Sequence, residues 1–401
     1  MSDDPKIARV APVAKPLAYD QTVLVLQGGG ALGAYQAGAF EVLHENDIRP
    51  DWVAGISIGA INAAIIAGNA PEDRVKQLKS FWKTLGVSFP GEAVALGNPV
   101  SELSYRAVSG LWATAAGVPG MFRPWFLPPW FNPAGTPEAT SFYDTSPLRR
   151  TLLDHADFDR INRGEVRLSL GATQVRSGNV IYFDTQDISV KSGGRVITPE
   201  HVMASAALPP GFPMVTIDGE AYWDGGIVSN TPLQYLLEQD DLFNSLVFQV
   251  DLFSAVGPEP ATMDEVQERI KDIAYSSRTR LNTDAFLEKY RLRHAIRTLA
   301  QHVDPDVRRK LFADGLPGEI YNGRVTLVHI INRANRREIQ SKDYEFWKMS
   351  IDCHWRDGMR DAKTAIAAGT WRQISDPETG LAVYDYIRPD QTEDVQRPLG
   401  C

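Results

Sequence analysis

The sequence predicts an α/β protein in which helices flank a mostly parallel sheet, followed by a largely helical C-terminal extension. Two observations predict this class. Short, apolar, β-branched runs at residues 22–27 and 51–55 alternate with apolar helical segments. A strand–helix–strand connection of this length brings its two strands side by side and parallel. Further strand-like runs at residues 246–250 and 325–331 extend the pattern.

The first elements follow one another closely. Residues 22–27 (TVLVLQ) read as a buried strand that ends in three glycines. Residues 33–46 carry apolar side chains at helical spacing, and residues 51–55 (DWVAG) form the second strand. Residues 58–67 are apolar nearly all round, which predicts a buried helix. A further helix is expected over residues 72–84.

An irregular segment of about residues 86–141 interrupts this order. It is rich in Gly, Pro and aromatic residues, and Arg123 is the only charge between Arg106 and Glu138. Such a long irregular stretch in a compact domain is usually functional. Clustered tryptophans suit a membrane interface or a lid over a lipid site, and a Pro-rich loop packed on the core is the alternative. The aromatic residues are Trp112, Phe122, Trp125, Phe126, Trp130 and Phe131.

Regular structure is expected again from Ser146-Pro147, a good start for a short helix. Strand pairs are predicted at residues 166–173 with 180–184, and at 214–217 with 221–223, and a helix begins near Thr198. Residues 264–303 and 344–367 are expected to be helical, and the strand at 325–331 can return to the sheet. We therefore expect a disordered tail at 1–20, an α/β domain at 21–253 that includes the irregular segment, and a mostly helical extension at 254–401.

Composition restricts the functional class. The chain has 401 residues, 43% of them hydrophobic, and a formal net charge of −9. A net negative charge disfavours a general attraction to nucleic acid. No apolar run is long enough for a signal peptide or a membrane span. We expect a cytoplasmic protein whose membrane contact, at the inner surface, is peripheral.

A candidate nucleophile lies between the second strand and the helix after it. Gly55-Ile56-Ser57-Ile58-Gly59 matches G-x-S-x-G in the strand–turn–helix context that this motif requires. The turn exposes the serine hydroxyl, and the following helix offers N–H groups and a positive dipole end to an oxyanion. An ordinary turn with a helix-capping serine is the alternative interpretation.

Residues 28–33 (GGGALG), called the glycine loop below, follow the first strand directly. We expect this loop to lie beside the Ser57 turn, because both strands end at the same edge of the sheet. The unhindered N–H groups of Gly29 and Gly30 can form an oxyanion hole. Gly28-x-Gly30-x-x-Gly33 also spells a dinucleotide fingerprint, which requires an acidic residue at the end of the second strand. That strand ends in the Ser57 motif, and Asp51 lies at its start, so the hydrolase interpretation is favoured.

A candidate base follows much later in the chain. A serine hydroxyl needs a proton acceptor, and Tyr222-Trp223-Asp224-Gly225-Gly226 places a carboxylate after a short strand and before a sharp turn. An Asp before a Gly is often only a turn residue. Residues 230–232 (NTP) are expected to cap the next helix.

The ordered set GGGALG, GISIGA and WDGG resembles the patatin-like phospholipase family, over residues 23 to 250. Residues 204–212 (ASAALPPGF) resemble the family's stretch between nucleophile and acid, and the C-terminal part resembles a bacterial subset with an extension. The resemblance implies a three-layer α/β/α fold and a Ser57–Asp224 dyad that cleaves lipid esters through an acyl-enzyme. It also implies that Gly28, Gly29 and Gly30 hold the oxyanion.

The resemblance implies neither a metal nor a cofactor. The sequence departs from the family at Leu32, where an Arg or Lys is usual. Two alternatives stay open: a Ser–Asp–His triad that uses His329 or His354, and a non-catalytic module that binds lipid or a partner. The head group, the acyl-chain length and the oligomeric state cannot be read from the sequence.

Overall fold

The computed structural model describes residues 18–88, 112–186, 196–239, 244–277, 279–300, 302–313, 323–333, 342–374 and 380–386. Most of the predicted N-terminal tail, residues 1–17, lies outside this set, as do residues 89–111 of the predicted insertion.

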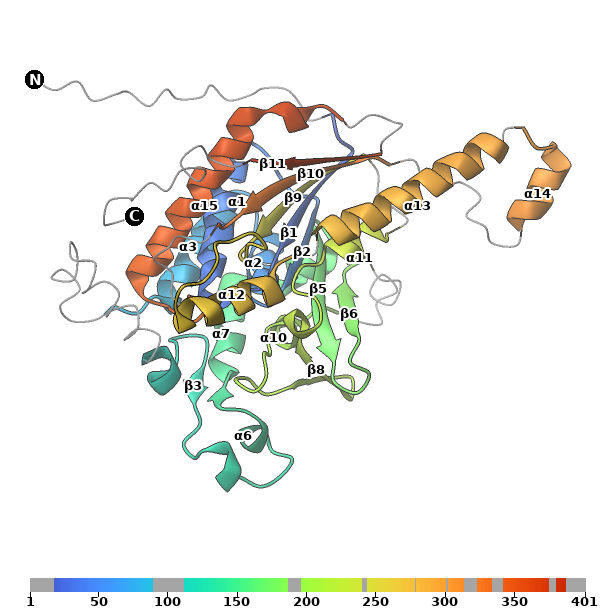
Figure 1. Ribbon diagram of the computed structural model, residues 1–401. Coiled ribbons are helices and arrows are strands. Elements are labelled where there is room, and N and C mark those ends of the chain that lie inside the picture. Colours follow the sequence, from blue (N-terminus) through green and yellow to red (C-terminus); the bar gives the residue numbers. More distant parts are fainter. Residues whose placement is uncertain are drawn as a thin grey trace, which may run out of the picture.

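One twisted sheet forms the centre of the molecule (Figure 1). Its parallel strands stand in the order β11-β10-β9-β1-β2-β5. Beyond them, β6 and β8 pair antiparallel with β5, and β7 pairs with β8. The parallel strands are β1 (Gln21–Leu26), β2 (Trp52–Ile56), β5 (Arg167–Gln174), β9 (Ser245–Asp251), β10 (Val325–Ile331) and β11 (Leu381–Asp385). The others are β6 (Val180–Asp184), β7 (Val215–Ile217) and β8 (Glu220–Asp224).

Helices cover both faces of the sheet, so the fold has three layers. One face is covered by α1 (Gly33–Glu45), α2 (Ile58–Ala67), α3 (Arg74–Leu85) and α15 (Lys348–Ala368). The opposite face packs against α11 (Leu233–Leu237) and the first half of α13 (Thr279–Ala300).

Side chains along β1, a central strand of the sheet, contribute alternately to two hydrophobic cores. Leu24 and Leu26 belong to the larger core, whereas Val23 and Val25 belong to the smaller core on the other face. Successive strand side chains point to opposite faces, which produces this division. Each fully buried side chain of this kind stabilises the fold by roughly 1.5–3 kcal/mol.

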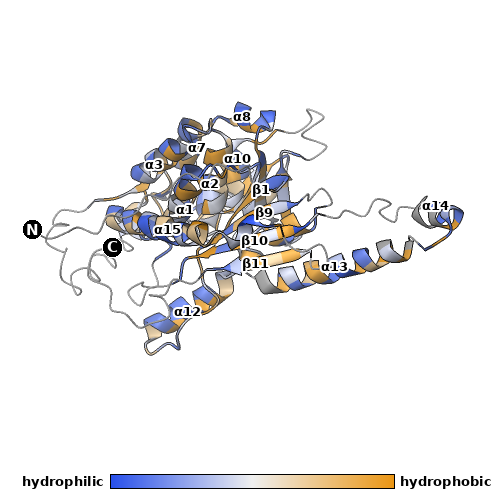
Figure 2. Ribbon diagram, turned by 90° about the horizontal axis from the view of Figure 1, so that it is seen from above, coloured by the Kyte–Doolittle hydropathy of each residue, from blue (hydrophilic) through white to orange (hydrophobic). Residues whose placement is uncertain are grey.

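The remaining elements surround this core. The helices are α6 (Pro137–Thr140), α7 (Ser146–His155), α8 (Phe158–Arg163), α10 (Pro199–Ser205), α12 (Met263–Tyr275) and α14 (Pro305–Ala313). A two-stranded ribbon joins β3 (Arg123–Pro124) to β4 (Tyr143–Asp144). Short 3-10 turns are η1 (Gly30–Leu32), η2 (Pro129–Phe131), η3 (Gly225–Ile227) and η4 (Thr370–Arg372). Helix α13 extends away from the α/β body toward α14 (Figures 1 and 2).

The predicted fold class is confirmed, and most predicted elements are present with small shifts at their ends. The helix expected from residue 72 begins at Arg74, and the one expected from residue 344 begins at Lys348. Strand β10 does return to the sheet, beside β9. Strand β11 was not predicted, because its five residues carry little signal beyond pairing with β10. Within the described residues, no helix is both long and apolar enough to span a membrane.

Candidate active site

Ser57 lies in a tight turn between β2 and α2. Its backbone has φ 57° and ψ −125°, a conformation that side-chain-bearing residues rarely adopt. Glycines make the turn possible: a Cβ on Gly55 would lie 2.3 Å from the Gly59 carbonyl oxygen, and a Cβ on Gly59 would lie 2.3 Å from the Leu26 carbonyl oxygen. Both contacts are with rigid backbone, so the motif's glycines are required by close packing.

The surroundings hold the turn through the Ser57 backbone, not through its hydroxyl. The Ser57 N–H donates to the Ser205 carbonyl oxygen at 3.1 Å, and the Ser205 hydroxyl donates to the Gly171 carbonyl oxygen at 2.6 Å. Ser57 is the N-cap of α2, so the positive end of that helix dipole faces the turn.

The glycine loop after β1 lies against Ser57, as the strand order predicts. A Cβ on Gly28 would lie 3.0 Å from the Ser57 Cβ. The Gly28 N–H donates to the Asn230 carbonyl oxygen at 3.1 Å, so it is already used. For the N–H groups of Gly29 and Gly30, no acceptor is present among the described residues. The N–H groups of Gly29 and Gly30 are therefore the ones left to bind a further group, whereas Gly28 permits the close approach of the loop to Ser57.

Asp224 is the last residue of β8, and its side chain is fully enclosed, with 1% exposure. The Ser57 side chain donates a hydrogen bond to its carboxylate, and the Gly226 N–H donates a second bond to Oδ1 at 2.7 Å. Burial raises the pKa of Asp224 to about 7, although these two hydrogen bonds act in the opposite direction. Gly225 permits the turn, because a Cβ there would lie 2.6 Å from the Gly171 carbonyl oxygen.

One cavity of about 310 Å³ contains all five residues that the sequence singled out. Gly28, Gly29, Gly30, Ser57 and Asp224 line it together, and most of the remaining wall is apolar. The wall comes from at least four separate parts of the chain. Examples are Met121 and Phe122 of the insertion, Leu208 and Phe212 after α10, and Phe253 and Phe346 beyond the catalytic motifs.

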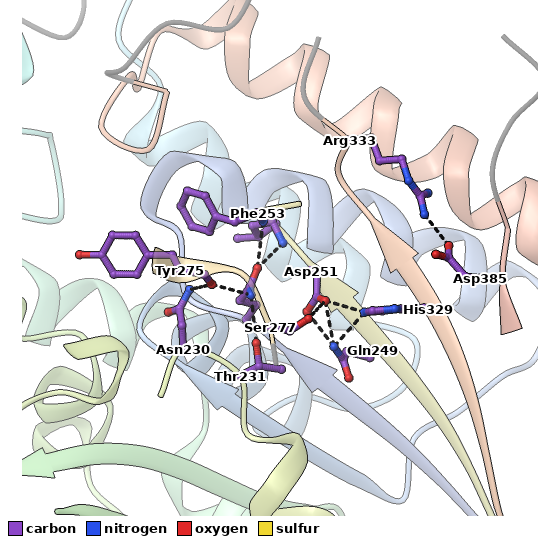
Figure 3. Close-up of polar contacts among 12 residues, drawn as sticks. Asn230, Thr231, Gln249, Asp251, Phe253, Tyr275, Ser277, His329, Arg333 and Asp385 are labelled. Atoms are coloured by element: carbon purple, nitrogen blue, oxygen red, sulfur yellow. Dashed lines mark hydrogen bonds and ion pairs between the residues drawn. The ribbon is translucent and has the colours of Figure 1, made fainter. Parts of the chain in front are cut away.

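Sequence reasoning missed two residues that hold the glycine loop. Asn230 does not cap α11. Its side-chain amide donates to the Gly28 carbonyl oxygen and to the Tyr275 carbonyl oxygen, each at 3.0 Å, and the contact with Tyr275 is drawn in Figure 3. Buried Gln27 accepts from the N–H groups of Leu252 and Phe253 through its side chain. Gln27 adjoins the glycine motif, so its position was the available signal, whereas the contacts of Asn230 depend on the tertiary fold.

Neither candidate histidine is among the residues that line the cavity. His329 lies within β10, where its Nε2 is 2.5 Å from Asp251 and 2.9 Å from the Gln249 side chain (Figure 3). Strands β9 and β1 separate β10 from β2. At about 4.8 Å per strand, His329 is roughly 14 Å from the strand that carries Ser57. His354 is buried within α15, on the face of the sheet that α1, α2 and α3 also cover.

The structure also locates Asp51, which concerns the dinucleotide-binding alternative, and Leu32, where the family usually has a cation. Asp51 lies at the amino end of the strands, where its carboxylate accepts from the Thr22 N–H at 2.8 Å, far from the glycine loop. A ribose-binding acid is therefore not provided by this residue. Leu32 is fully buried in the core, so its position supplies no cation to the cavity. Among the described residues, no group of three or more His, Cys, Asp or Glu could hold a metal.

The aromatic segment divides into two parts. Phe122 is buried and its ring lies 4.8 Å from Tyr143 and 5.0 Å from Phe212, centroid to centroid, within the cavity wall. Phe126 is 98% exposed and Trp130 is 79% exposed. Phe131 is also exposed, whereas Trp125 is partly buried and donates through Nε1 to the Ser141 hydroxyl at 3.0 Å. One end of the segment thus lines the cavity and the other presents apolar surface to solvent.

A parallel sheet with a strained serine, a buried carboxylate and a glycine loop at one edge defines a hydrolase-like α/β class. Residues 24–237 match the family described as patatin-like phospholipase. Residues 273–378 match a second family, described as patatin phospholipase. The first match covers more than half of the chain, so this chain belongs to the patatin-like phospholipase family.

Individual relatives share only a short stretch. A patatin-like phospholipase domain-containing protein of Coccidioides immitis is 40% identical over 60 residues, 15% of this chain and 8% of the relative. The triacylglycerol lipase SDP1L of Arabidopsis thaliana is 31% identical over 68 residues, 17% of this chain and 8% of its own length.

Two solved structures are similar at a lower level. VipD from Legionella pneumophila has a TM-score of 0.36 and 15% identity, covering 88% of this chain and 68% of VipD. Human GIVD cytosolic phospholipase A2 has a TM-score of 0.32 and 11% identity, covering 57% of this chain and 42% of that one.

Proposed function

We propose that this protein is a lipid acyl hydrolase that cleaves carboxylic esters through a Ser57–Asp224 dyad. One observation carries the proposal: a serine in a strained turn donates a hydrogen bond to a buried carboxylate, inside an apolar cavity beside glycine N–H groups that bond to no acceptor among the described residues. Family membership supports the same chemistry. Metal and nucleotide have no part in the proposed reaction.

The acylation step uses both side chains. The Ser57 Oγ attacks the ester carbonyl carbon while its proton moves to the Asp224 carboxylate. The carbonyl π electrons move to oxygen, and the resulting oxyanion is stabilised by the N–H groups of Gly29 and Gly30 and by the end of α2. Collapse of this intermediate breaks the bond to the alcohol, which takes the proton from Asp224. An acyl chain is then bound to Ser57.

Deacylation repeats the sequence with water. Asp224 accepts a proton from a water molecule that attacks the acyl carbonyl, and the second intermediate releases the carboxylic acid. The proton on Asp224 returns to the Ser57 Oγ, which restores the site. A base with a pKa of about 7 is well matched to this task at neutral pH, because it both accepts and returns a proton readily.

The shape of the cavity supports a lipid ester as substrate. Its wall includes Met121, Phe122, Leu208 and Phe212, which offer apolar contacts to an acyl chain. The segment that contains Met121 and Phe122 also carries the exposed side chains of Phe126 and Trp130. Aromatic side chains of this kind insert readily at a lipid–water interface, so we infer peripheral contact with a membrane or a lipid aggregate.

The proposal is tested with purified protein and esters of graded acyl-chain length, with and without a chelator. Wild-type protein should hydrolyse them in both conditions. Ser57→Ala should lose activity by several orders of magnitude while circular dichroism and melting temperature stay close to wild type. Turnover retained by the folded variant, or activity that a chelator removes and a divalent ion restores, would contradict the mechanism. Binding of lipid without any turnover would instead support the non-catalytic alternative.

A further inference from the structure

The back of the glycine loop is formed by a segment from the distant C-terminal part of the chain, residues 342–346. The Asp343 carbonyl oxygen accepts from the Ala31 N–H at 2.7 Å. A Cβ on Gly30 would lie 1.9 Å from that same oxygen, so the two backbones are in direct contact. Gly30 has φ 54° there, a backbone conformation that suits glycine best.

This segment is fixed in turn by ion pairs to α12. The Lys271 ammonium lies 2.7 Å from the Asp343 carboxylate and 5.2 Å from the centre of the Tyr344 ring. Lys342, which is 3% exposed, lies 3.0 Å from Glu268 and 2.8 Å from Asp272. Buried or partly buried pairs of this kind hold a geometry more firmly than surface pairs do.

The same segment also lines the cavity that contains the candidate site. Asp343, Tyr344 and Phe346 line the cavity that contains Ser57 and Asp224. A carboxylate at this wall would repel a developing oxyanion if its charge were unpaired. Lys271 therefore has two effects on the loop: it anchors the backbone that supports Gly30, and it neutralises the carboxylate beside it.

We propose that Lys271 and Asp343 are a positioning pair that completes the oxyanion hole from the C-terminal part of the chain. The inference rests on the proposed function, because it assigns to this contact an effect on the step at Ser57. Neither residue acts on the substrate as a catalytic group. Their effect passes through the Asp343 carbonyl oxygen to the Gly30–Ala31 peptide.

The test is a double-mutant cycle on a short soluble ester. Lys271→Met and Asp343→Asn should each lower kcat roughly tenfold with KM within about twofold, because small displacements of oxyanion donors affect the transition state most. The double variant should be no worse than either single one, since the pair acts as a unit. Lys271→Arg should keep most of the activity. Lys348→Met, in an exposed ion pair close to the same segment, is the matched control and should match wild type.

A second measurement is independent of catalysis. Amide hydrogen exchange in the peptide that contains Gly30 and Ala31 should be faster in Lys271→Met than in wild type or Lys348→Met. Losses of kcat that multiply in the double variant, or equal effects on kcat and KM with a lowered melting temperature, would overturn the proposal. So would unchanged exchange in the loop. If wild-type protein hydrolysed no ester, the proposed function would fail, while the exchange measurement would still decide whether the pair holds the loop.

Discussion

At the scale of single residues, stability and chemistry conflict at Asp224. A carboxylate enclosed on all sides is costly in its charged form, yet the proposed reaction requires that form to accept the Ser57 proton. The hydrogen bonds from Ser57 and from the Gly226 N–H offset only part of this cost, because the net effect is a pKa of about 7. Two predictions follow from that value.

The first concerns the pH dependence of catalysis. Since only ionised Asp224 accepts the proton, kcat/KM on a soluble ester should rise with pH, with a midpoint near 7 and a plateau above it. Initial rates in overlapping buffers of constant ionic strength measure this directly. A profile that is flat between pH 5 and 8 would mean that Asp224 does not titrate in this range or does not act as the base.

The second concerns stability. The pKa of Asp224 is higher in the folded protein than the value of 3.8 for the free group, so the folded state holds an extra proton between these two pH values. Its contribution to stability therefore falls as pH rises from about 4 to about 7, by up to roughly 1.4 kcal/mol per unit. Asp224→Asn removes this pH-dependent decrease in stability, because an amide does not ionise.

Asp224→Asn should accordingly be inactive yet more stable than wild type, by a margin that is larger at pH 8 than at pH 5. Melting temperatures or denaturant midpoints of both proteins at the two pH values provide the comparison. His329→Ala and His354→Ala are controls for catalysis, because neither should approach the loss of activity in Asp224→Asn. A stability margin that does not change with pH would contradict the assigned pKa.

At the scale of elements, the described part of the aromatic segment, residues 112–141, runs from the cavity wall to the outer surface. Phe122 packs in the cavity wall, whereas Phe126, Trp130 and Phe131 are exposed. Replacing these three exposed residues by Ser should strongly reduce hydrolysis of vesicle or micellar substrate, because in the proposed peripheral contact their apolar surface inserts at the lipid interface. Hydrolysis of a short soluble ester should change little, since the cavity is untouched.

The matched control for this experiment is a triple Ser replacement of Leu281, Leu292 and Leu299. These residues are also exposed, lie on α13, and are not among the residues that line the cavity. The control should hydrolyse both substrates as wild type does. Equal losses on both substrates in the aromatic variant, with lower thermal stability, would mean that the segment mainly packs the fold.

The elements also show why part of the site was predictable and part was not. Ser57 and the glycine loop could be placed together from sequence, because a β-α-β unit forces β1 and β2 to be neighbours. The contacts of Asn230 and Asp343 could not, because each depends on a fold-level approach of segments about 200 and 300 residues apart. Asp343 contacts the loop through its backbone carbonyl oxygen, and every residue type has this group, so the sequence gives no indication of the contact.

At the scale of the whole molecule, the C-terminal part is continuous with the α/β core. Strands β10 and β11 extend the same sheet, α15 packs on α1, and residues 342–346 close the back of the glycine loop. The division into two domains at residue 253 thus remains a proposal. Residues from before and after this position line the cavity. Helix α13 is the exception, since its second half extends away from this body.

The central claim is that Ser57 is a nucleophile activated by Asp224, and covalent labelling tests it most directly. A fluorophosphonate probe reacts with serines that are both nucleophilic and next to an oxyanion site. Peptide mass spectrometry of the labelled wild-type protein should find the adduct on Ser57. Labelling should be absent in Ser57→Ala, strongly slowed in Asp224→Asn, and unchanged in His329→Ala. An adduct on another serine, or no adduct on folded wild-type protein, would contradict the account.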